Sequence, residues 1–173
     1  MRLILFRHGP AGQRDASRWP DDSQRPLTTR GLERTRRAAG GLARIEPGIH
    51  AILTSPCLRA EATAKLLADA LGSADVQVLE ALRPGGSVRQ VITQLQDFPT
   101  AAVVVLVGHE PDLGRLAGML VFGVASQLPL KKAGACEVRF EGAVTPGRGQ
   151  LAWLVPPRFL RRRAGRDDKV CPA

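Results

Sequence analysis

The chain alternates short, uninterrupted apolar runs with segments of helical periodicity, and this alternation restricts its fold more than any other feature. Two of the runs, Leu3–Phe6 and Ala101–Val107, contain no polar residue at all. Such a run predicts a strand that is buried on both faces, as in a parallel sheet covered by helices. We therefore predict an α/β fold, a three-layer sandwich with a largely parallel central sheet flanked by helices on both faces.

The other predicted elements follow the same alternation. Ala51–Thr54 is expected to be a strand, and Ser55-Pro56 has the form of a helix N-cap followed by proline in the first turn. A helix is expected to start at about Thr28 and to be ended by Pro47-Gly48. Its apolar face is expected to carry Leu32, Ala39, Leu42 and Ile45. Further strands are predicted at 76–79, 135–140 and 151–155, and further helices at 57–71, 88–95 and 111–121.

The 173 residues fit one domain, which we place at residues 1–157. A basic C-terminal tail, residues 158–173, is expected to follow and contains Arg161–Arg163. Residues 10–27 are rich in Pro, Asp, Ser and Arg without periodicity, which predicts a long loop. Long loops in compact domains are often functional.

Composition limits the classes of partner. The net charge of +9 favours anionic partners such as phosphate esters or acidic protein surfaces, although a solvated arginine-rich surface explains it equally well. With only 4% aromatic residues, no platform for single-stranded nucleic acid is expected, and we predict no specific nucleic-acid partner. The longest apolar run, Ala101–Val107, is far shorter than the ~20 residues that span a bilayer, so no membrane partner is expected.

The cysteines indicate the compartment. Cys57, Cys136 and Cys171 are too few and too scattered for a disulfide framework or a zinc site. Their odd number suits a reducing environment. We therefore predict a cytoplasmic location.

Two histidines follow the two fully apolar runs. His8 comes after Arg7, and His109 comes after Gly108, so the carboxyl ends of both predicted strands carry an imidazole. Ligands of open α/β sheets bind beyond these strand ends. One such histidine alone is more often a packed or solvated residue, but two at the same sheet edge favour a catalytic site there. A neutral imidazole is a nucleophile for phosphorus, and arginines such as Arg7 and Arg59 suit phosphoryl oxygens. The pattern predicts phosphoryl-transfer chemistry.

Four segments in order resemble the motifs of the histidine phosphatase superfamily, the phosphoglycerate-mutase-like enzymes. They are Leu5-Phe6-Arg7-His8-Gly9, Pro26-Leu27-Thr28 with Gly31, Thr54-Ser55-Pro56-Cys57-Leu58-Arg59-Ala60 with Thr63, and Val107-Gly108-His109-Glu110. The resemblance covers residue 1 to about Val155. The short chain, the segment 108–113 and Trp153-Leu154 before Pro156-Pro157 are similar to the SixA-type phosphohistidine phosphatases.

This resemblance implies a metal-independent phosphatase with no organic cofactor. His8 is expected to attack phosphorus and to be phosphorylated transiently, before water hydrolyses the phosphohistidine. Arg7, Arg59 and His109 are expected to bind the phosphoryl oxygens. The implied substrate is phosphohistidine on a protein, for example a phosphorelay domain.

Three further residues are candidates for substrate binding. Gly9 lets backbone and substrate approach closely. Arg25 precedes the Pro-Leu-Thr segment and is expected either to line the pocket or to be a solvated loop residue. Glu110 is expected either to assist proton transfer or to complement the dipole of the following helix.

One departure from the family concerns the general acid. Many relatives carry a glutamate shortly after the third strand, where this chain has Pro84. Glu80 lies slightly earlier and is a candidate substitute, as are Glu110 and solvent. An absent acid matters least when the leaving group is an imidazole, whose nitrogen is easily protonated. The gap therefore favours phosphohistidine as substrate.

Two alternatives stay open. One is a phosphomonoesterase that acts on a small molecule with the same phosphate pocket. The other is a non-catalytic module that binds a phosphorylated protein or another polyanion. The physiological substrate and the oligomeric state are not determined by the sequence.

Overall fold

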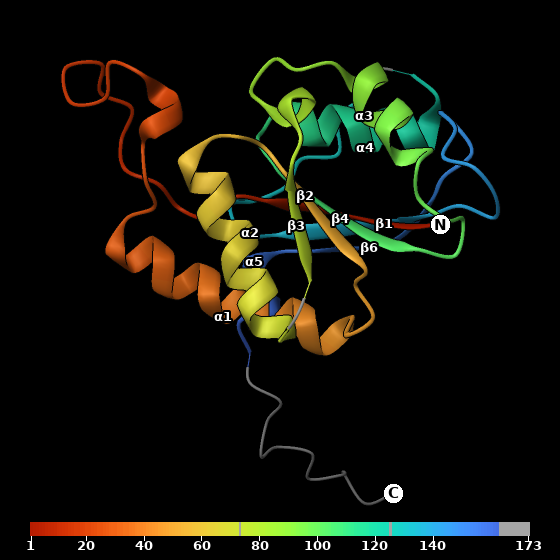
Figure 1. Cartoon of the computed structure of the whole chain (residues 1–173), viewed down its shortest axis with the longest axis horizontal. Coiled ribbons are helices and arrows are strands. Elements are labelled where there is room, and N and C mark those ends of the chain that lie inside the picture. The colour runs from red at the N-terminus through yellow and green to blue at the C-terminus, as the bar shows by residue number, and fades with distance from the viewer. Residues whose placement is uncertain (73, 125, 163–173) are drawn as a thin grey trace, which may run out of the picture.

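The computed structural model describes residues 1–72, 74–124 and 126–162. Its centre is a single six-stranded sheet in the order β3-β2-β4-β1-β5-β6 (Figure 1). Strands β1 to β4 pair in parallel, whereas β5 and β6 pair antiparallel with their neighbours. The largely parallel sheet is as predicted. The strands are β1 Arg2–Arg7, β2 Ala51–Thr54, β3 Asp75–Val78, β4 Val103–Gly108, β5 Ala135–Arg139 and β6 Gln150–Val155.

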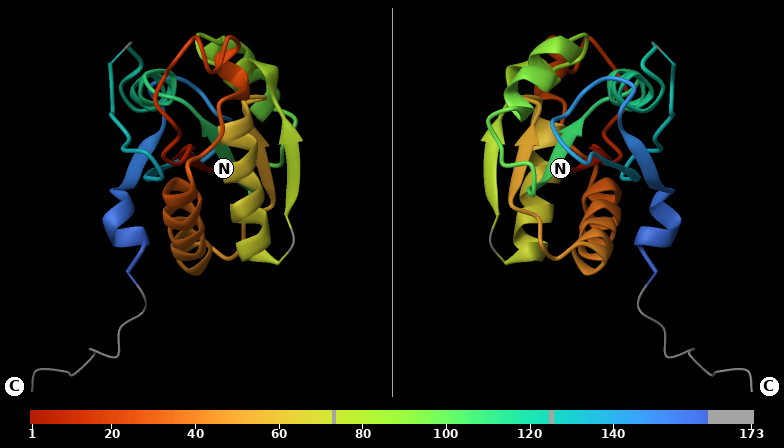
Figure 2. Two further views of the ribbon diagram at one scale, coloured as in Figure 1. Left: turned by 90° about the vertical axis from the view of Figure 1, so that its left-hand side faces the viewer. Right: turned by 90° about the vertical axis from the view of Figure 1, so that its right-hand side faces the viewer.

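Helices cover both faces of this sheet (Figures 1 and 2). Side chains alternate along β1, so Leu3 and Leu5 join the core beneath one helical layer while Ile4 and Phe6 join the core beneath the other. Helices α3 and α4 cover the first face, and α1, α2 and α5 cover the second. The helices are α1 Thr29–Ile45, α2 Leu58–Leu71, α3 Val88–Leu95, α4 Asp112–Phe122 and α5 Pro157–Leu160, with short 3-10 turns η1 Asp22–Gln24 and η2 Glu80–Leu82.

Helix α1 buries only part of the predicted stripe. Ala39 and Leu42 are buried as expected, but Leu32 is 37% and Ile45 52% exposed. Most residues of the buried stripe are small, which lets α1 pack closely against its neighbours. The stripe consists of Gly31, Thr35, Ala38, Ala39, Gly41 and Leu42. Within the described parts of the chain, no helix is both long enough and apolar enough to cross a membrane.

The folded domain extends past the predicted boundary at residue 157. Helix α5 lies beside α1 (Figure 2), and its Leu160 is only 1% exposed. The backbones of α1 and α5 approach so closely at Gly41 that a Cβ atom there would lie 1.7 Å from the carbonyl oxygen of Leu160. Residues 158–160 therefore belong to the domain rather than to the basic tail. Residues 163–173 of the predicted tail lie outside the described residues.

Replacing Leu160 with alanine tests this extension. Loss of a buried leucine side chain costs about 2–5 kcal/mol of unfolding free energy. We expect a loss of this size in urea unfolding of Leu160→Ala, and a smaller loss for the half-exposed neighbour in Phe159→Ala. Equal and negligible effects of the two substitutions would contradict the packing of α5.

Candidate active site

The register of two parallel strands brings the histidines together. Arg7 at the end of β1 pairs with Gly108 at the end of β4, so the next residue of each strand is a histidine. The backbone N–H of His8 donates to the carbonyl of Gly108 at 3.0 Å, which continues the pairing past the strand ends. The ring centroids of His8 and His109 are 4.9 Å apart. The two histidines thus form one site, as the sequence analysis expected.

His8 is held in the form that a nucleophile requires. Its ring is buried, and Nδ1 lies 2.7 Å from the carbonyl oxygen of Gly9. A carbonyl can only accept, so Nδ1 carries the proton and Nε2 keeps its lone pair. Burial, followed by repulsion from His109 if it were protonated and from the charges of Arg59 and Arg7, lowers the pKa of His8 to about 3. The imidazole is therefore neutral near pH 7.

His109 is fixed by a serine that the sequence analysis assigned another role. Its Nε2 lies 2.8 Å from Oγ of the fully buried Ser55. Ser55 was predicted to be the N-cap of α2, but the N-cap is Cys57, whose backbone N–H donates to Ser55 Oγ at 3.3 Å. Burial and then Arg59 lower the pKa of His109 to about 3, so this imidazole is also neutral.

Two arginines, the half-buried Arg7 and the buried Arg59, lie beside the histidines with unused donors. Nη1 of Arg7 donates to the carbonyl of Leu130 at 2.8 Å, and Nη1 of Arg59 donates to the carbonyl of Asp22 at 2.6 Å. Nε of each is buried and has no hydrogen-bond partner among the described residues. An unpaired buried donor is costly, so these atoms suit an anionic ligand. Burial lowers the pKa of both guanidinium groups, but arginine stays charged in proteins.

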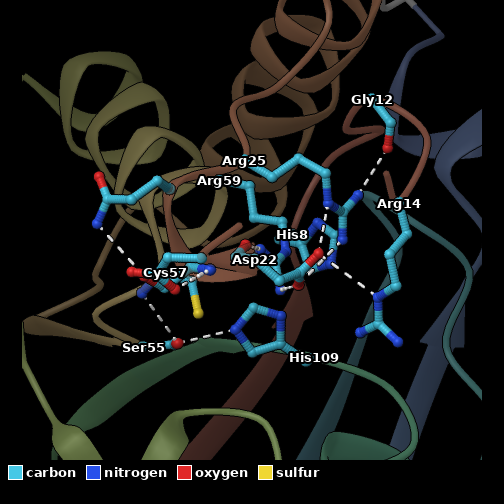
Figure 3. Close-up of polar contacts among 12 residues, drawn as sticks. His8, Gly12, Arg14, Asp22, Arg25, Ser55, Cys57, Arg59 and His109 are labelled. Atoms are coloured by element: carbon cyan, nitrogen blue, oxygen red, sulfur yellow. Dashed lines mark hydrogen bonds and ion pairs between the residues drawn. The ribbon is translucent and has the colours of Figure 1, made fainter. Parts of the chain in front are cut away.

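Asp22 is the centre of an arginine cluster beside the histidines (Figure 3). Its carboxylate accepts from Arg25 at 2.8 and 3.3 Å and forms ion pairs with Arg59 at 3.1 Å and Arg14 at 3.4 Å. Arg25 also donates to the carbonyl of Gly12 at 2.6 Å. These contacts tie the loop of residues 10–27 to the start of α2.

These side chains surround a cavity of about 320 Å³, here called the histidine cavity. A larger cavity of about 740 Å³ lies around Met1 and Arg139 and contains no histidine. Met1 precedes β1 and Arg139 ends β5, so this cavity lies at the sheet edge opposite to His8. We assign the site to the smaller cavity because the candidate groups converge there. Its described lining residues are Arg7, His8, Gly12, Gln13, Arg14, Arg25, Arg59, Pro84, His109, Glu110 and Lys132.

Only some of the remaining predicted site residues line the histidine cavity. Arg25 and Glu110 line the histidine cavity, but Gly9 does not. The N–H of Gly9 donates to Thr63 Oγ1 at 3.1 Å, and a Cβ on Gly9 would collide with Thr35, so its small size serves packing. Gly9 thus has a packing role beside the cavity, and its part in substrate binding stays a prediction.

Neither carboxylate considered as general acid is well placed. Glu80 does not line the histidine cavity; it is exposed and pairs with Arg83 at 3.1 Å. Glu110 lines it, but its Oε1 accepts from the N–H of Leu130 at 3.0 Å and its Oε2 from Gln127 Nε2 at 3.2 Å. Glu110 thereby holds the segment whose Leu130 carbonyl binds Arg7.

Sequence reasoning missed several residues of this site. Ser55, Arg14 and Lys132 come from loops and Asp22 from the short turn η1, where no periodicity marks a residue that points inward. The one usable signal was Asp22 three residues before Arg25 in a loop next to a predicted motif. Burial, Arg7, Arg25 and Arg59 together lower the pKa of Lys132, which shows how cationic the cavity is.

Comparison with known proteins agrees with this geometry. Residues 3–84 match the profile of the histidine phosphatase superfamily, branch 1. Phosphohistidine phosphatase SixA of Escherichia coli is 33% identical over 164 residues, which cover 93% of this chain and 97% of SixA. The chain belongs to the histidine phosphatase superfamily. An uncharacterised protein of a Picosynechococcus strain is 39% identical over 165 residues, 92% of this chain and 99% of that protein.

Solved structures place the chain near the SixA branch of the superfamily. The structure of the protein histidine phosphatase SixA complexed with tungstate matches with a TM-score of 0.80 and 31% identity, covering 92% of this chain and 99% of that one. A mycobacterial glucosyl-3-phosphoglycerate phosphatase matches with a TM-score of 0.69 at 18% identity, which shows a shared fold. Superfamily membership and the likeness to SixA support phosphatase activity.

The buried neutral histidines predict a pH-dependent stability. The pKa of His8 and of His109 is about 3 in the folded chain against 6.5 for an ordinary histidine, so the unfolded chain binds more protons between these values. Unfolding free energy should therefore be fully present above pH 6.5 and decrease as pH falls towards 3. Histidine NMR titration in phosphate-free buffer, with urea unfolding at pH 7 and 5, measures both effects. The prediction fails if both rings titrate near pH 6.5.

Proposed function

We propose that this protein hydrolyses phosphohistidine on a protein substrate, through a phosphohistidine intermediate on His8. The observation that carries the proposal is the state of His8. Its Nδ1 is committed to the Gly9 carbonyl, and its neutral ring lies beside His109 in a cavity also lined by Arg7 and Arg59. Nε2 therefore has a lone pair and faces a cationic cavity built for a phosphoryl group.

In the first step, Nε2 of His8 attacks phosphorus, and the bond from phosphorus to the substrate nitrogen breaks. The phosphoryl oxygens take hydrogen bonds from Arg7, Arg59 and His109, where Nε of each arginine has no other described partner. Forked guanidinium donors suit this charge distribution because they bind two oxygens at once. The departing imidazole nitrogen takes a proton from water.

In the second step, water attacks the phosphorus of phospho-His8. The bond between phosphorus and Nε2 breaks, inorganic phosphate leaves, and His8 returns to its neutral form with Nδ1 still bound to Gly9. The arginines stabilise the same equatorial oxygens in both steps, so one cavity serves the complete cycle. Each step transfers one phosphoryl group, first to His8 and then to water, and only the two steps together return the enzyme to its starting state.

The choice of phosphohistidine rests on the leaving group. Pro84 lines the cavity where many relatives carry an acid, and both oxygens of Glu110 accept hydrogen bonds from other groups. An imidazole leaving group needs little help from a positioned acid, whereas an alkoxide needs a proton. The 33% identity to a phosphohistidine phosphatase supports the same substrate class.

The two alternatives predict different behaviour. A small-molecule phosphomonoesterase would hydrolyse phosphate esters and leave phosphohistidine intact. A binding module would retain a phosphorylated protein without releasing phosphate, in a salt-dependent way. An intact set of Arg7, His8, Arg59 and His109 favours turnover over binding alone. The cytoplasmic location and the identity of the phosphorylated partner stay predictions.

The test is release of phosphate from a phosphohistidine-bearing protein, in the presence of a chelator. We expect turnover by the parent protein and a loss of roughly 10³-fold or more in His8→Ala, because the nucleophile is removed. The matched control is His50→Ala. His50 is exposed and binds the N–H of Val103 at 3.0 Å outside the cavity, so per folded molecule this variant should keep its activity.

A phosphoserine peptide serves as the second substrate. Faster release from this ester than from phosphohistidine would favour the phosphomonoesterase. Retained activity in His8→Ala would exclude the covalent intermediate. Binding without release by the parent protein would favour the non-catalytic module.

A further inference from the structure

We propose that Asp22 is a positioning residue for phosphoryl binding: its carboxylate holds the arginines towards the histidine cavity. This inference rests on the proposed function, since it assigns the cavity to a phosphoryl group. It adds a residue from the loop 10–27 to the machinery provided by the strand ends and the start of α2.

The contacts of Asp22 hold Arg59 through its two terminal nitrogens and leave Nε without a described partner. The backbone carbonyl of Asp22 accepts from Nη1 of Arg59 at 2.6 Å, and its Oδ2 lies 3.1 Å from Nη2. Both terminal nitrogens are therefore anchored on the same residue. Nε of Arg59 is buried without a described partner. Asp22 thus fixes the orientation of the guanidinium plane while Nε remains available.

Asp22 fixes Arg25 in a similar way. Its carboxylate binds Nε of Arg25 at 2.8 Å and Nη2 at 3.3 Å, while Nη1 of Arg25 donates to the Gly12 carbonyl at 2.6 Å. Arg14 approaches the same carboxylate at 3.4 Å. One carboxylate therefore connects three arginines and joins the two ends of the loop to α2 (Figure 3).

The position of Asp22 indicates whether its carboxylate holds the arginines in place or competes with a phosphoryl group for them. Arg14, Arg25 and Arg59 are among the described residues that line the histidine cavity, and Asp22 is not. Asp22 instead lines a neighbouring cavity of about 520 Å³ with Pro56 and Cys57. Its carboxylate is thus absent from the described lining of the histidine cavity, which leaves the space between the histidines and the arginines open to a phosphoryl group.

The negative charge of Asp22 offsets the repulsion among the three arginines. Three converging arginines repel one another, and Arg59 is 2% exposed, so water screens its charge poorly. A carboxylate among them offsets the repulsion and keeps them close before a ligand arrives. The hydrogen bond from Arg25, followed by Arg59, lowers the pKa of Asp22 to about 2, so the charge is present throughout the neutral range.

The experiment compares Asp22→Asn with Asp21→Asn. Asparagine keeps the shape of the side chain at position 22 and removes its charge. Asp21 is the matched control, because its carboxylate binds Ser23 rather than the arginines of the cavity. Inorganic phosphate is titrated by calorimetry, and kcat and KM are measured with the phosphohistidine-bearing protein.

We expect Asp22→Asn to weaken phosphate binding about tenfold or more and to raise KM in parallel, while Asp21→Asn stays within about twofold of the parent. Asp22→Glu keeps the charge and should lie between parent and Asp22→Asn. Phosphate should shift the NMR signal of Arg59 Nε–H in the parent and shift it less in Asp22→Asn. A purely structural role would not change this signal in a folded variant.

Two results would overturn the proposal, and each is distinct. If the parent binds phosphate and Asp22→Asn binds it equally or more tightly, Asp22 competes for the arginines or has no part in binding. If the parent neither binds phosphate nor releases it from substrate, the proposed function fails and the inference fails with it. Should Asp22→Asn not fold, Asp22→Glu with the Arg59 signal decides the same question.

Discussion

The parallel pairing of β1 with β4 is the constraint on which the site depends. Arg7 is in register with Gly108, so the residues that follow, His8 and His109, leave the sheet side by side. A slip of one residue would turn alternate side chains to the opposite face and separate the rings. Every residue of β4 is buried, so a slip would disturb the packing on both faces of the sheet and would be costly. The core thereby sets the geometry of the catalytic edge.

Charge is organised around this edge in two layers. The inner layer consists of the two neutral histidines together with Arg7 and Arg59, whose buried Nε atoms have no described partner. The outer layer consists of carboxylates that hold the inner one: Asp22 binds three arginines, and Glu110 fixes the segment that binds Arg7. A preorganised cationic site of this kind favours the charge of a phosphoryl transition state without reorganising during the reaction.

The proposed preference for phosphohistidine concerns the leaving group and not the phosphate site. Superfamily membership accounts for the shared phosphate site, and solved relatives with the same fold include a phosphatase for a sugar-linked phosphoglycerate. Pro84 removes the acid that an alkoxide leaving group requires, while the carboxylate of Glu110 is engaged by backbone and side-chain donors. Chemical demand at the leaving group, rather than phosphate binding, separates these substrates.

The sequence by itself determined the α/β fold, the strand ends that carry His8 and His109, and the motif that places Arg59 at the start of α2. These follow from local pattern: uninterrupted apolar runs, glycines beside histidines, and helix periodicity. Only the tertiary structure decided that Ser55 binds His109, that Gly9 serves packing, and that Asp22 gathers the arginines. These contacts join residues far apart in the chain across loops, where no periodicity fixes the direction of a side chain.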